Sequence, residues 1–203
     1  MPVDARGGGG APALPRVEEL ALPGLHAVET AVHHDERGWF SESYQEAKLR
    51  AAGLPELRFV QANVSANRRT GTTRGLHAEP WDKYVSVVAG AALAAVLDLR
   101  AGPTFGRAVT HELVPGRALL VPRGCANGFQ TLEPQTVYSY LVTAHWSPGT
   151  AYPAVDPFDP ELALPWPVGA ELAVVSAKDR ANPPLRDVAP LDTWPGRSPR
   201  VAE

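Results

Sequence analysis

Histidine and tyrosine are the side chains in this sequence that could move protons at neutral pH. His77 ends an Arg-Gly-Leu-His segment that begins at Arg74, and with Lys83 this places a candidate base and two cations within ten residues. Histidine has an unperturbed pKa of ~6.5, so it can take a proton from an activated carbon acid. Because a single histidine is more often an ordinary surface or hydrogen-bonded residue, His77 alone is a weak indication of catalysis.

Tyr138 and Tyr140 are two residues apart in Thr136–Val142, which has the composition of a strand. Their side chains would therefore share one face of that strand. A phenol with a pKa of ~10 serves as an acid where a nearby charge or the reaction intermediate assists it. The alternative is that both rings pack in the core with satisfied hydroxyls.

Two further segments combine charge and turn residues. Asp35–Glu42 holds three carboxylates, two aromatic rings and Arg37, which could clamp a phosphate or carboxylate through two parallel hydrogen bonds. Composition alone favours a charged turn that enters a strand. In Val121–Phe129, a Pro-x-Gly sequence precedes an Asn-Gly pair at Asn127, and tight-turn chemistry is sufficient to explain these residues.

The histidine pattern argues against a metal centre. A metal-binding barrel needs several converging His and carboxylate ligands, typically two histidines close together on one strand and a third later. His77 is followed by alanine and glutamate, the later position is Asn127, and the adjacent His33 and His34 do not complete such a set. We therefore expect no metal and no cofactor.

The distribution of turn residues and apolar segments predicts an all-β fold. The 21 prolines and 18 glycines are spread along the chain, as expected for short strands joined by frequent turns. Ala92–Leu99 has apolar residues on both faces, which indicates a strand buried in a two-layer structure. Ser43–Ala52 is the main helical candidate, with Gly53 as its stop. We predict an all-β sandwich or barrel of the jelly-roll kind with a few short helices. The expected strands are Phe59–Val64, Tyr84–Val88, Ala92–Leu99, Ala118–Val121 and Thr136–Val142.

The chain is expected to form one domain over residues 17–188, between flexible tails at 1–16 and 189–203. The Pro-rich region from about residue 148 onward reads as loops with one short helix. A formal net charge of −3 gives no electrostatic footprint for nucleic acid. No apolar run approaches the ~20 residues of a membrane span, and no signal peptide is apparent, so the expected location is the cytoplasm. The single cysteine, Cys125, excludes an internal disulfide framework.

Several short blocks, in order, resemble the dTDP-4-dehydrorhamnose 3,5-epimerase family of the cupin superfamily. They are DERGWFSESY, FVQANVS, TRGLHAEP, VLDLRAGPTFG, VPRGCANGF, YLVTAHWSP and DPFDPELALPWP. The resemblance runs from about Leu25 to the segment 176–179, and its specificity comes from the order of many blocks. ANGFQ, YSYLVTAHWSP and LPWP look more like the branch that makes deoxysugars for natural products.

The resemblance implies a role for each matched residue. His77 falls on the general base, Tyr140 on the general acid, and Asp159 on the carboxylate that pairs with the histidine, with Asp156 as the alternative. The positions that hold the nucleotide sugar are Arg37, Glu42, Gln61, Arg74, Lys83, Asn127 and the aromatic Trp146. The family also implies a homodimer, a dTDP-4-keto-6-deoxyhexose substrate, and inversion at C3, C5 or both through an enolate.

Two departures from the family pattern affect substrate contacts. Asn127 stands where a histidine is common, and Ala151 where many members have a glutamate. Asparagine donates hydrogen bonds but cannot act as a base. The alternative functions are a keto-sugar isomerase on the same fold, a metal-dependent cupin oxygenase, and an inactive sugar-nucleotide binder.

Overall fold

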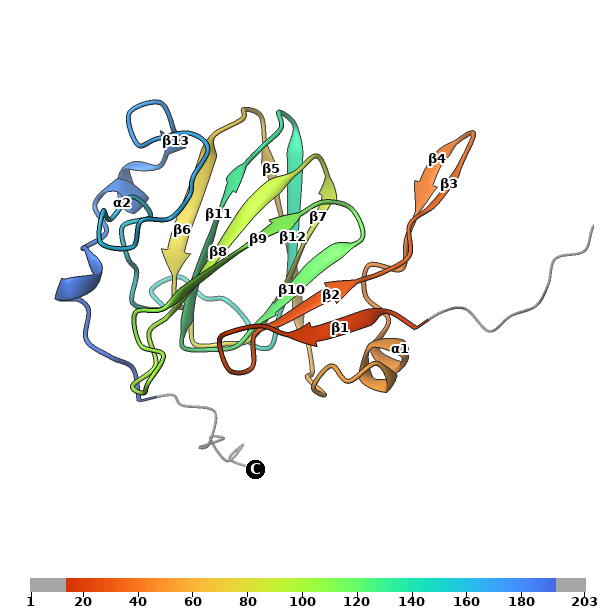
Figure 1. Cartoon of the computed structure of the whole chain (residues 1–203), viewed down its shortest axis with the longest axis horizontal. Helices are drawn as coiled ribbons and strands as arrows, with labels where there is room; N and C mark the ends of the chain where they lie inside the picture. The colour runs from red at the N-terminus through yellow and green to blue at the C-terminus, as the bar shows by residue number, and fades with distance from the viewer. Residues whose placement is uncertain (1–13, 193–203) are drawn as a thin grey trace, which may run out of the picture.

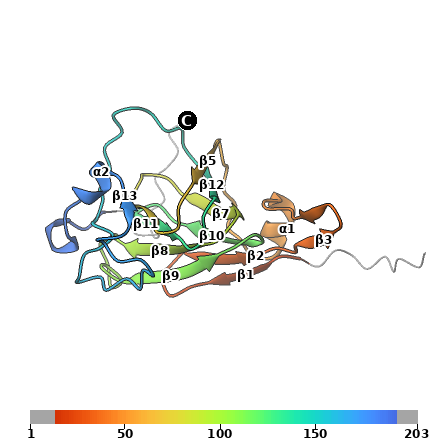
Figure 2. The same cartoon turned by 90° about the horizontal axis from the view of Figure 1, so that it is seen from above.

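The computed structural model describes residues 14–192 and shows two β-sheets packed face to face (Figures 1 and 2). The first sheet contains, in spatial order, β1 (Arg16–Glu19), β2 (His26–Glu29), β10 (Arg117–Val121), β7 (Lys83–Ala89), β12 (Thr136–Val142) and β5 (Gln61–Asn67). The second contains β13 (Val174–Val175), β6 (Thr72–His77), β11 (Cys125–Thr131), β8 (Ala92–Asp98) and β9 (Ala108–Leu113). The predicted all-β jelly roll is confirmed.

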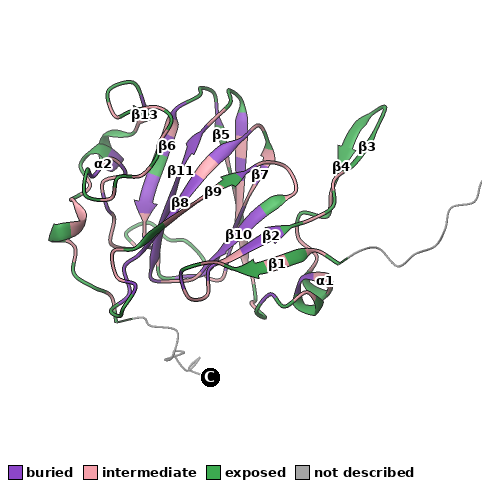
Figure 3. Cartoon of the chain, in the orientation of Figure 1, coloured by how far each residue is buried: buried purple, intermediate pink, exposed green. Residues whose placement is uncertain are grey.

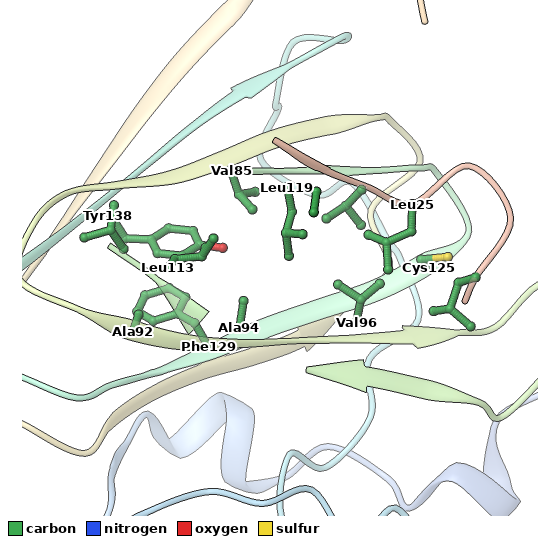
Figure 4. Close-up of a cluster of buried hydrophobic side chains, with 14 residues drawn as sticks. Leu25, Val85, Ala92, Ala94, Val96, Leu113, Leu119, Cys125, Phe129 and Tyr138 are labelled. Atoms are coloured by element: carbon green, nitrogen blue, oxygen red, sulfur yellow. The ribbon is translucent and has the colours of Figure 1, made fainter. Parts of the chain in front are cut away.

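The main core lies between the two sheets (Figure 4). It draws Val85 and Leu119 from the first sheet, and Ala94, Val96 and Phe129 from the second. Figure 3 shows this layering as buried strand centres flanked by exposed loops. Apolar side chains from the facing strands therefore hold the two sheets together.

β8 is buried on both faces, as its sequence predicts. Ala92, Ala94 and Val96 belong to the core between the sheets, whereas Ala95 and Leu97 belong to a second cluster on the outer side. The segment that follows β12 covers most of this outer cluster. The partly buried apolar residues that pack against the cluster are Phe105, Leu162, Leu164, Trp166, Leu185, Val188 and Leu191. The Pro-rich region thus packs as a cover over the second sheet.

Backbone hydrogen bonds tie the chain to the barrel beyond the predicted boundary at residue 188. The Leu191 amide donates to the Leu99 carbonyl at 2.7 Å, and the Leu191 carbonyl accepts from the Ala101 amide at 2.7 Å. At the other end, β1 begins at Arg16. The remaining parts of the predicted tails, residues 1–13 and 193–203, lie outside the described residues. Within the described part, no helix is long and apolar enough to cross a membrane.

Helices are short and few. The predicted helix at 43–52 is α1 (Glu46–Ala51), whose N-cap side chain, Gln45, accepts from the Lys48 amide. Gly53 follows it with φ +100°, a conformation in which glycine lacks the strain of other residues. α2 (Ala177–Arg180) and a 3₁₀ turn (Leu185–Asp187) lie in the C-terminal cover.

Asn127 and Gly128 are strand residues, so the prediction that they form a turn is wrong. The tight turn is limited to Pro122–Gly124, closed by a hydrogen bond from the Cys125 amide to the Pro122 carbonyl. Both residues belong to β11 and lie opposite β6. A Cβ on Gly75 would lie 2.6 Å from the Asn127 carbonyl oxygen and 2.7 Å from the Gly128 Cα. The glycines therefore serve the close approach of two strands.

Candidate active site

A cavity of about 320 Å³ opens between the two sheets. One wall comes from β5, β7 and β12 of the first sheet, and the facing wall from β6 and β11 of the second. Its polar lining consists of Gln61, Asn63, Ser65, Arg74, His77, Glu79, Lys83, Asn127, Tyr138, Tyr140, Tyr152 and Asp179, with Trp81 and Trp146 among its aromatic residues. The cavity gathers residues from segments far apart in the sequence.

His77, the last residue of β6, contacts a carboxylate inside this cavity. Its Nε2 lies 2.8 Å from Oδ1 of Asp179, and the Gly75 amide donates to Oδ2 of the same carboxylate at 3.3 Å. Burial works to raise the pKa of Asp179, but the hydrogen bonds from His77 and Gly75 more than offset it, so the pKa lies below its ordinary value. An ionised carboxylate only accepts, so Nε2 donates and Nδ1 carries the lone pair.

Asp159 does not pair with His77, and this residue assignment from the resemblance is wrong. Its carboxylate accepts from the Glu161 amide at 2.9 Å and from the Leu185 amide at 2.7 Å. Asp156, the alternative, accepts from the Phe158 amide at 2.9 Å. Both carboxylates brace turns of the C-terminal cover, because backbone amides outside regular structure need such acceptors.

Asp179 is positioned by a local feature that the sequence does contain. Ser176 caps α2, and its side-chain oxygen accepts from the Asp179 amide at 3.0 Å. The Ser-x-x-Asp spacing is a helix-start signature of the capping-box type. β13 pairs with β6 immediately before this helix, and thereby brings Asp179 alongside His77. The signature marks the helix but gives no indication that the helix lies beside His77, so the residue was missed.

Tyr140 and Tyr138 both line the cavity from β12. Tyr138 is 2% exposed and stacks on Phe129 with ring centroids 4.0 Å apart, as a core residue does. Tyr140 is only partly buried. Burial raises the pKa of Tyr140, and the nearby Glu79 carboxylate raises it further, so the phenol keeps its proton at neutral pH. Tyr140 is therefore the better placed of the two to donate a proton to a ligand.

Lys83 enters the cavity from the start of β7 and forms a buried ion pair with Glu79. Its Nζ donates to a Glu79 oxygen and, at 3.4 Å, to the His77 carbonyl. Sequence reasoning assigned no role to Glu79. Its position two residues after the candidate base is the only signal in the sequence, and it does not show where the side chain points.

Gln61, Arg74 and Asn127 also line the cavity, as does Trp146 at its exposed rim. Asn67 fixes Arg74 by accepting from its Nε at 3.0 Å. The Gln61 side chain accepts from the Trp146 amide at 3.0 Å, and this contact ties the rim to β5. The structure thus brings these four sequence-predicted binding residues together with His77, Tyr140 and Lys83.

Arg37 and Glu42 are not brought to the cavity of their own chain. Arg37 lies in the hairpin of β3 (His33–Asp35) and β4 (Gly38–Phe40), which projects from the barrel (Figures 1 and 2). Its guanidinium pairs with Asp35 at 2.6 Å in an exposed setting. Glu42 pairs with Lys48 of α1.

Tyr152 is a cavity residue that sequence reasoning missed. Its ring centroid lies 5.7 Å from that of His77, and the Lys178 ammonium lies 5.2 Å from the Tyr152 ring. It comes from the loop region after residue 148, which has no periodic pattern that could have indicated its direction.

Between residues 14 and 192, no three His, Cys, Asp or Glu side chains are grouped so that they could hold a metal ion.

Comparisons with known proteins agree with this geometry. A family model described as dTDP-4-dehydrorhamnose 3,5-epimerase matches residues 19–187. A protein named RmlC homolog from Streptococcus pyogenes serotype M6 is 43% identical over 177 residues, covering 84% of this chain and 89% of the relative.

Two solved structures are similar across most of the chain. RmlC from Streptococcus suis, in complex with dTDP-D-xylose, has a TM-score of 0.83 and 40% identity, covering 88% of this chain and 95% of that one. NovW, a 4-keto-6-deoxy sugar epimerase from the novobiocin biosynthetic gene cluster of Streptomyces spheroides, has a TM-score of 0.76 and 32% identity, covering 88% and 92%. The resemblance is confirmed over most of the described residues, and the chain belongs to the dTDP-4-dehydrorhamnose 3,5-epimerase family.

Proposed function

We propose that this protein epimerises a dTDP-4-keto-6-deoxyhexose at C3, C5 or both, by removing a proton to form an enolate and returning one from the other side. One observation carries the proposal: a carboxylate-held histidine and a protonated tyrosine face one cavity from opposite sheets. A sugar bound between the sheets would have His77 on one face and Tyr140 on the other. That arrangement inverts a carbon centre.

His77 is the base in this mechanism. A hydrogen on a carbon next to the C4 ketone is acidic because its loss gives an enolate. Asp179 fixes the tautomer that leaves Nδ1 able to accept the proton, and stabilises the imidazolium that results. Nothing in this step requires a redox change.

Lys83 stabilises the enolate, and Tyr140 completes the inversion. The C4 oxygen gains negative charge as the proton leaves, and a fixed, buried ammonium is an effective partner for such charge. Tyr140 then donates its proton to the opposite face of the carbon, and its raised pKa ensures that this proton is present.

The nucleotide part of the substrate would occupy the polar and aromatic rim. Arg74 offers a guanidinium for the diphosphate, and Trp146, 53% exposed, offers a ring for the base to stack on. Binding energy from these remote groups would position the sugar for reaction.

We further propose that the protein acts as a homodimer in which the β3–β4 hairpin contributes to the partner's site. The hairpin projects from the barrel, and its Trp39 and Phe40 are 44% and 65% exposed. Exposed aromatic side chains on a projecting element are typical of an interaction surface. Such an arrangement would give Arg37 and Glu42 a cavity to bind in.

Proton exchange tests the proposed reaction directly. The protein is mixed with dTDP-4-keto-6-deoxyglucose in heavy water, and the sugar hydrogens are followed by NMR. Deuterium at C3, C5 or both is expected, and the labelled positions identify the inverted centres. His77→Ala should be folded and inactive. If folded wild-type protein labels neither carbon, or if the ketone moves from C4 to C3, the epimerase proposal is wrong.

A further inference from the structure

The Glu79–Lys83 pair is the most deeply buried charge pair in the wall of the cavity. The Glu79 and Lys83 side chains are 14% and 5% exposed, and both line the cavity. Glu79 lies in the short segment that joins β6 to β7. This segment begins just after His77, the candidate base, and ends just before Lys83, the candidate cation for the enolate.

Lys83 depends on Glu79 because, among the described residues, Glu79 is the anionic one of the two acceptors of its ammonium, the other being the His77 carbonyl. In the sheet register, Lys83 stands between Val121 of β10 and Val142 of β12. Its hydrogen bond to the His77 carbonyl is long, at 3.4 Å. A buried ammonium without a close anionic partner is costly and tends to lose its proton.

The other ionisable groups around the pair are neutral or already partnered. Burial raises the pKa of Cys125 to about 12, so its thiol carries no charge at neutral pH. The pKa values of Tyr138 and Tyr140 are raised as well. Asp82, next to Lys83 in sequence, pairs with Arg123 at 2.8 Å. The ionisable side chains that neighbouring strands bring close to the Glu79–Lys83 pair are those of His77 on β6, Cys125 on β11, and Tyr138 and Tyr140 on β12.

We propose that Glu79 is a positioning residue that holds the Lys83 ammonium in the cavity wall and keeps it protonated for the enolate at C4. This inference rests on the proposed epimerase function, and it assigns to Glu79 a role in catalysis that acts through Lys83. Electrostatics support it: burial lowers the pKa of Lys83, and the Glu79 carboxylate opposes that effect. The same carboxylate raises the pKa of Tyr140, so it also helps the acid to keep its proton.

A lysine titration tests the inference without any substrate. Lys48, Lys83 and Lys178 are the lysines of the chain, so protein labelled with ¹³C at lysine Cε gives few signals, and Lys83→Arg identifies the signal of Lys83. Glu79→Gln keeps the size of the side chain and removes its charge. The titration midpoint of Lys83 should fall by about one to three pH units in this variant, the usual effect of losing a close opposite charge.

Kinetics give the second measurement. In Glu79→Gln, the alkaline limb of the kcat profile should move down in pH together with the Lys83 midpoint, whereas KM should change little because the charge on the C4 oxygen develops after binding. Glu79→Asp, which keeps the charge, should recover part of the lost kcat. The matched control is Glu56→Gln, which removes an exposed carboxylate paired with Arg50 and should alter neither profile.

The outcomes are distinct. An unchanged Lys83 midpoint in folded Glu79→Gln overturns the positioning role, and leaves the epimerase proposal intact if the wild type still exchanges protons. Absence of exchange in the wild type overturns the proposed function, while the lysine titration still reports on the pair. Should Glu79→Gln fail to fold, Glu79→Ala, which also removes the carboxylate, decides by the same titration: a lowered Lys83 midpoint supports the role, and an unchanged one overturns it.

Discussion

Nε2 of His77 lies 2.8 Å from Oδ1 of Asp179, although 102 residues separate them in sequence. The contact fixes the histidine tautomer, because an ionised carboxylate can only accept. In the Asp179→Asn variant, the new amide group can instead donate a hydrogen bond to Nε2. The proton of the imidazole would then lie on Nδ1, the nitrogen that has to accept the substrate proton. We expect deuterium exchange into the keto-sugar to slow about 100- to 10,000-fold in this variant, the range of general-base catalysis. The control is an unchanged melting temperature, and near-normal exchange would contradict the assignment.

Asp159 should behave in the opposite way. Its carboxylate accepts from two backbone amides and is 2% exposed. Asp159→Ala removes both of these partly buried hydrogen bonds to a carboxylate, so we expect a loss of about 1 to 3 kcal/mol in the free energy of unfolding. Denaturant titration measures this loss. The kcat of the folded protein should stay within a few fold of wild type. A large loss of kcat in stable Asp159→Ala would restore it as a catalytic residue.

Several strands were predictable because their signals are local, whereas most of the site residues were expected from the family resemblance. Apolar alternation and turn residues indicated β8, β10 and β12, and the double burial of Ala92–Leu99 follows from its composition on both faces. Tyr140 stands on such a strand, whereas His77 ends β6, a strand that was not predicted, and its role was expected from the family resemblance. The position of Asp179 depends on a two-residue parallel pairing of β13 with β6, which leaves no periodic trace in sequence.

The predictions for Asn127 and Asp159 were wrong because local sequence patterns do not show which distant segments pack against them. Asn-Gly is the commonest hairpin signal, but here the glycine serves the close contact between β6 and β11. The Asp159 carboxylate accepts a hydrogen bond from the Glu161 amide, two residues away. Sequence alone cannot distinguish such a turn-stabilising carboxylate from a catalytic one. Arg37 lies on the projecting hairpin, away from the cavity of its own chain, so the fold of a single chain gives it no place in the site.

Tyr140 and Tyr138 should be separable by mutation. Tyr140→Phe removes the proton donor but leaves His77 able to form the enolate, so deuterium should still enter the substrate while the inverted product is lost. Tyr138→Phe retains the stacking on Phe129 and should still invert. NMR of the sugar in heavy water distinguishes exchange from inversion for both variants. Loss of inversion in Tyr138→Phe alone would assign the acid to Tyr138.

Asp98 should govern part of the acid sensitivity of the fold. Burial works to raise its pKa, but hydrogen bonds from Arg100 and Thr104 outweigh this, and the pKa lies below 3.8. Asp98 is therefore protonated at a lower pH in the folded state than in the unfolded chain, and its ionised form stabilises the fold. This stabilisation is complete above about pH 4 and is lost as the pH falls through the folded-state pKa.

The Asp98→Asn variant tests this linkage. It breaks the fully buried ion pair between Asp98 and Arg100, so we expect the free energy of unfolding at pH 7 to fall by about 3 to 5 kcal/mol. Below pH 4 its stability should decline less steeply than that of the wild type. Urea titrations at pH 7 and at a series of acid pH values measure both effects. Parallel acid limbs in the two proteins would show that Asp98 is not responsible.

The projecting hairpin predicts complementation between two inactive chains. If Arg37 binds substrate in the partner's cavity, Arg37→Ala should raise KM in a homodimer, and His77→Ala should abolish turnover. In a mixed dimer, the chain that keeps His77 receives Arg37 from the His77→Ala chain, so one complete site forms. At a substrate concentration where each variant alone is nearly silent, remixed protein should therefore recover about a quarter of wild-type activity, as random pairing in a two-fold dimer requires. Recovery should depend on exchange of subunits, which size-exclusion of differently tagged chains reports. If mixed dimers form and activity stays at the sum of the two variants, Arg37 acts in its own chain or not at all.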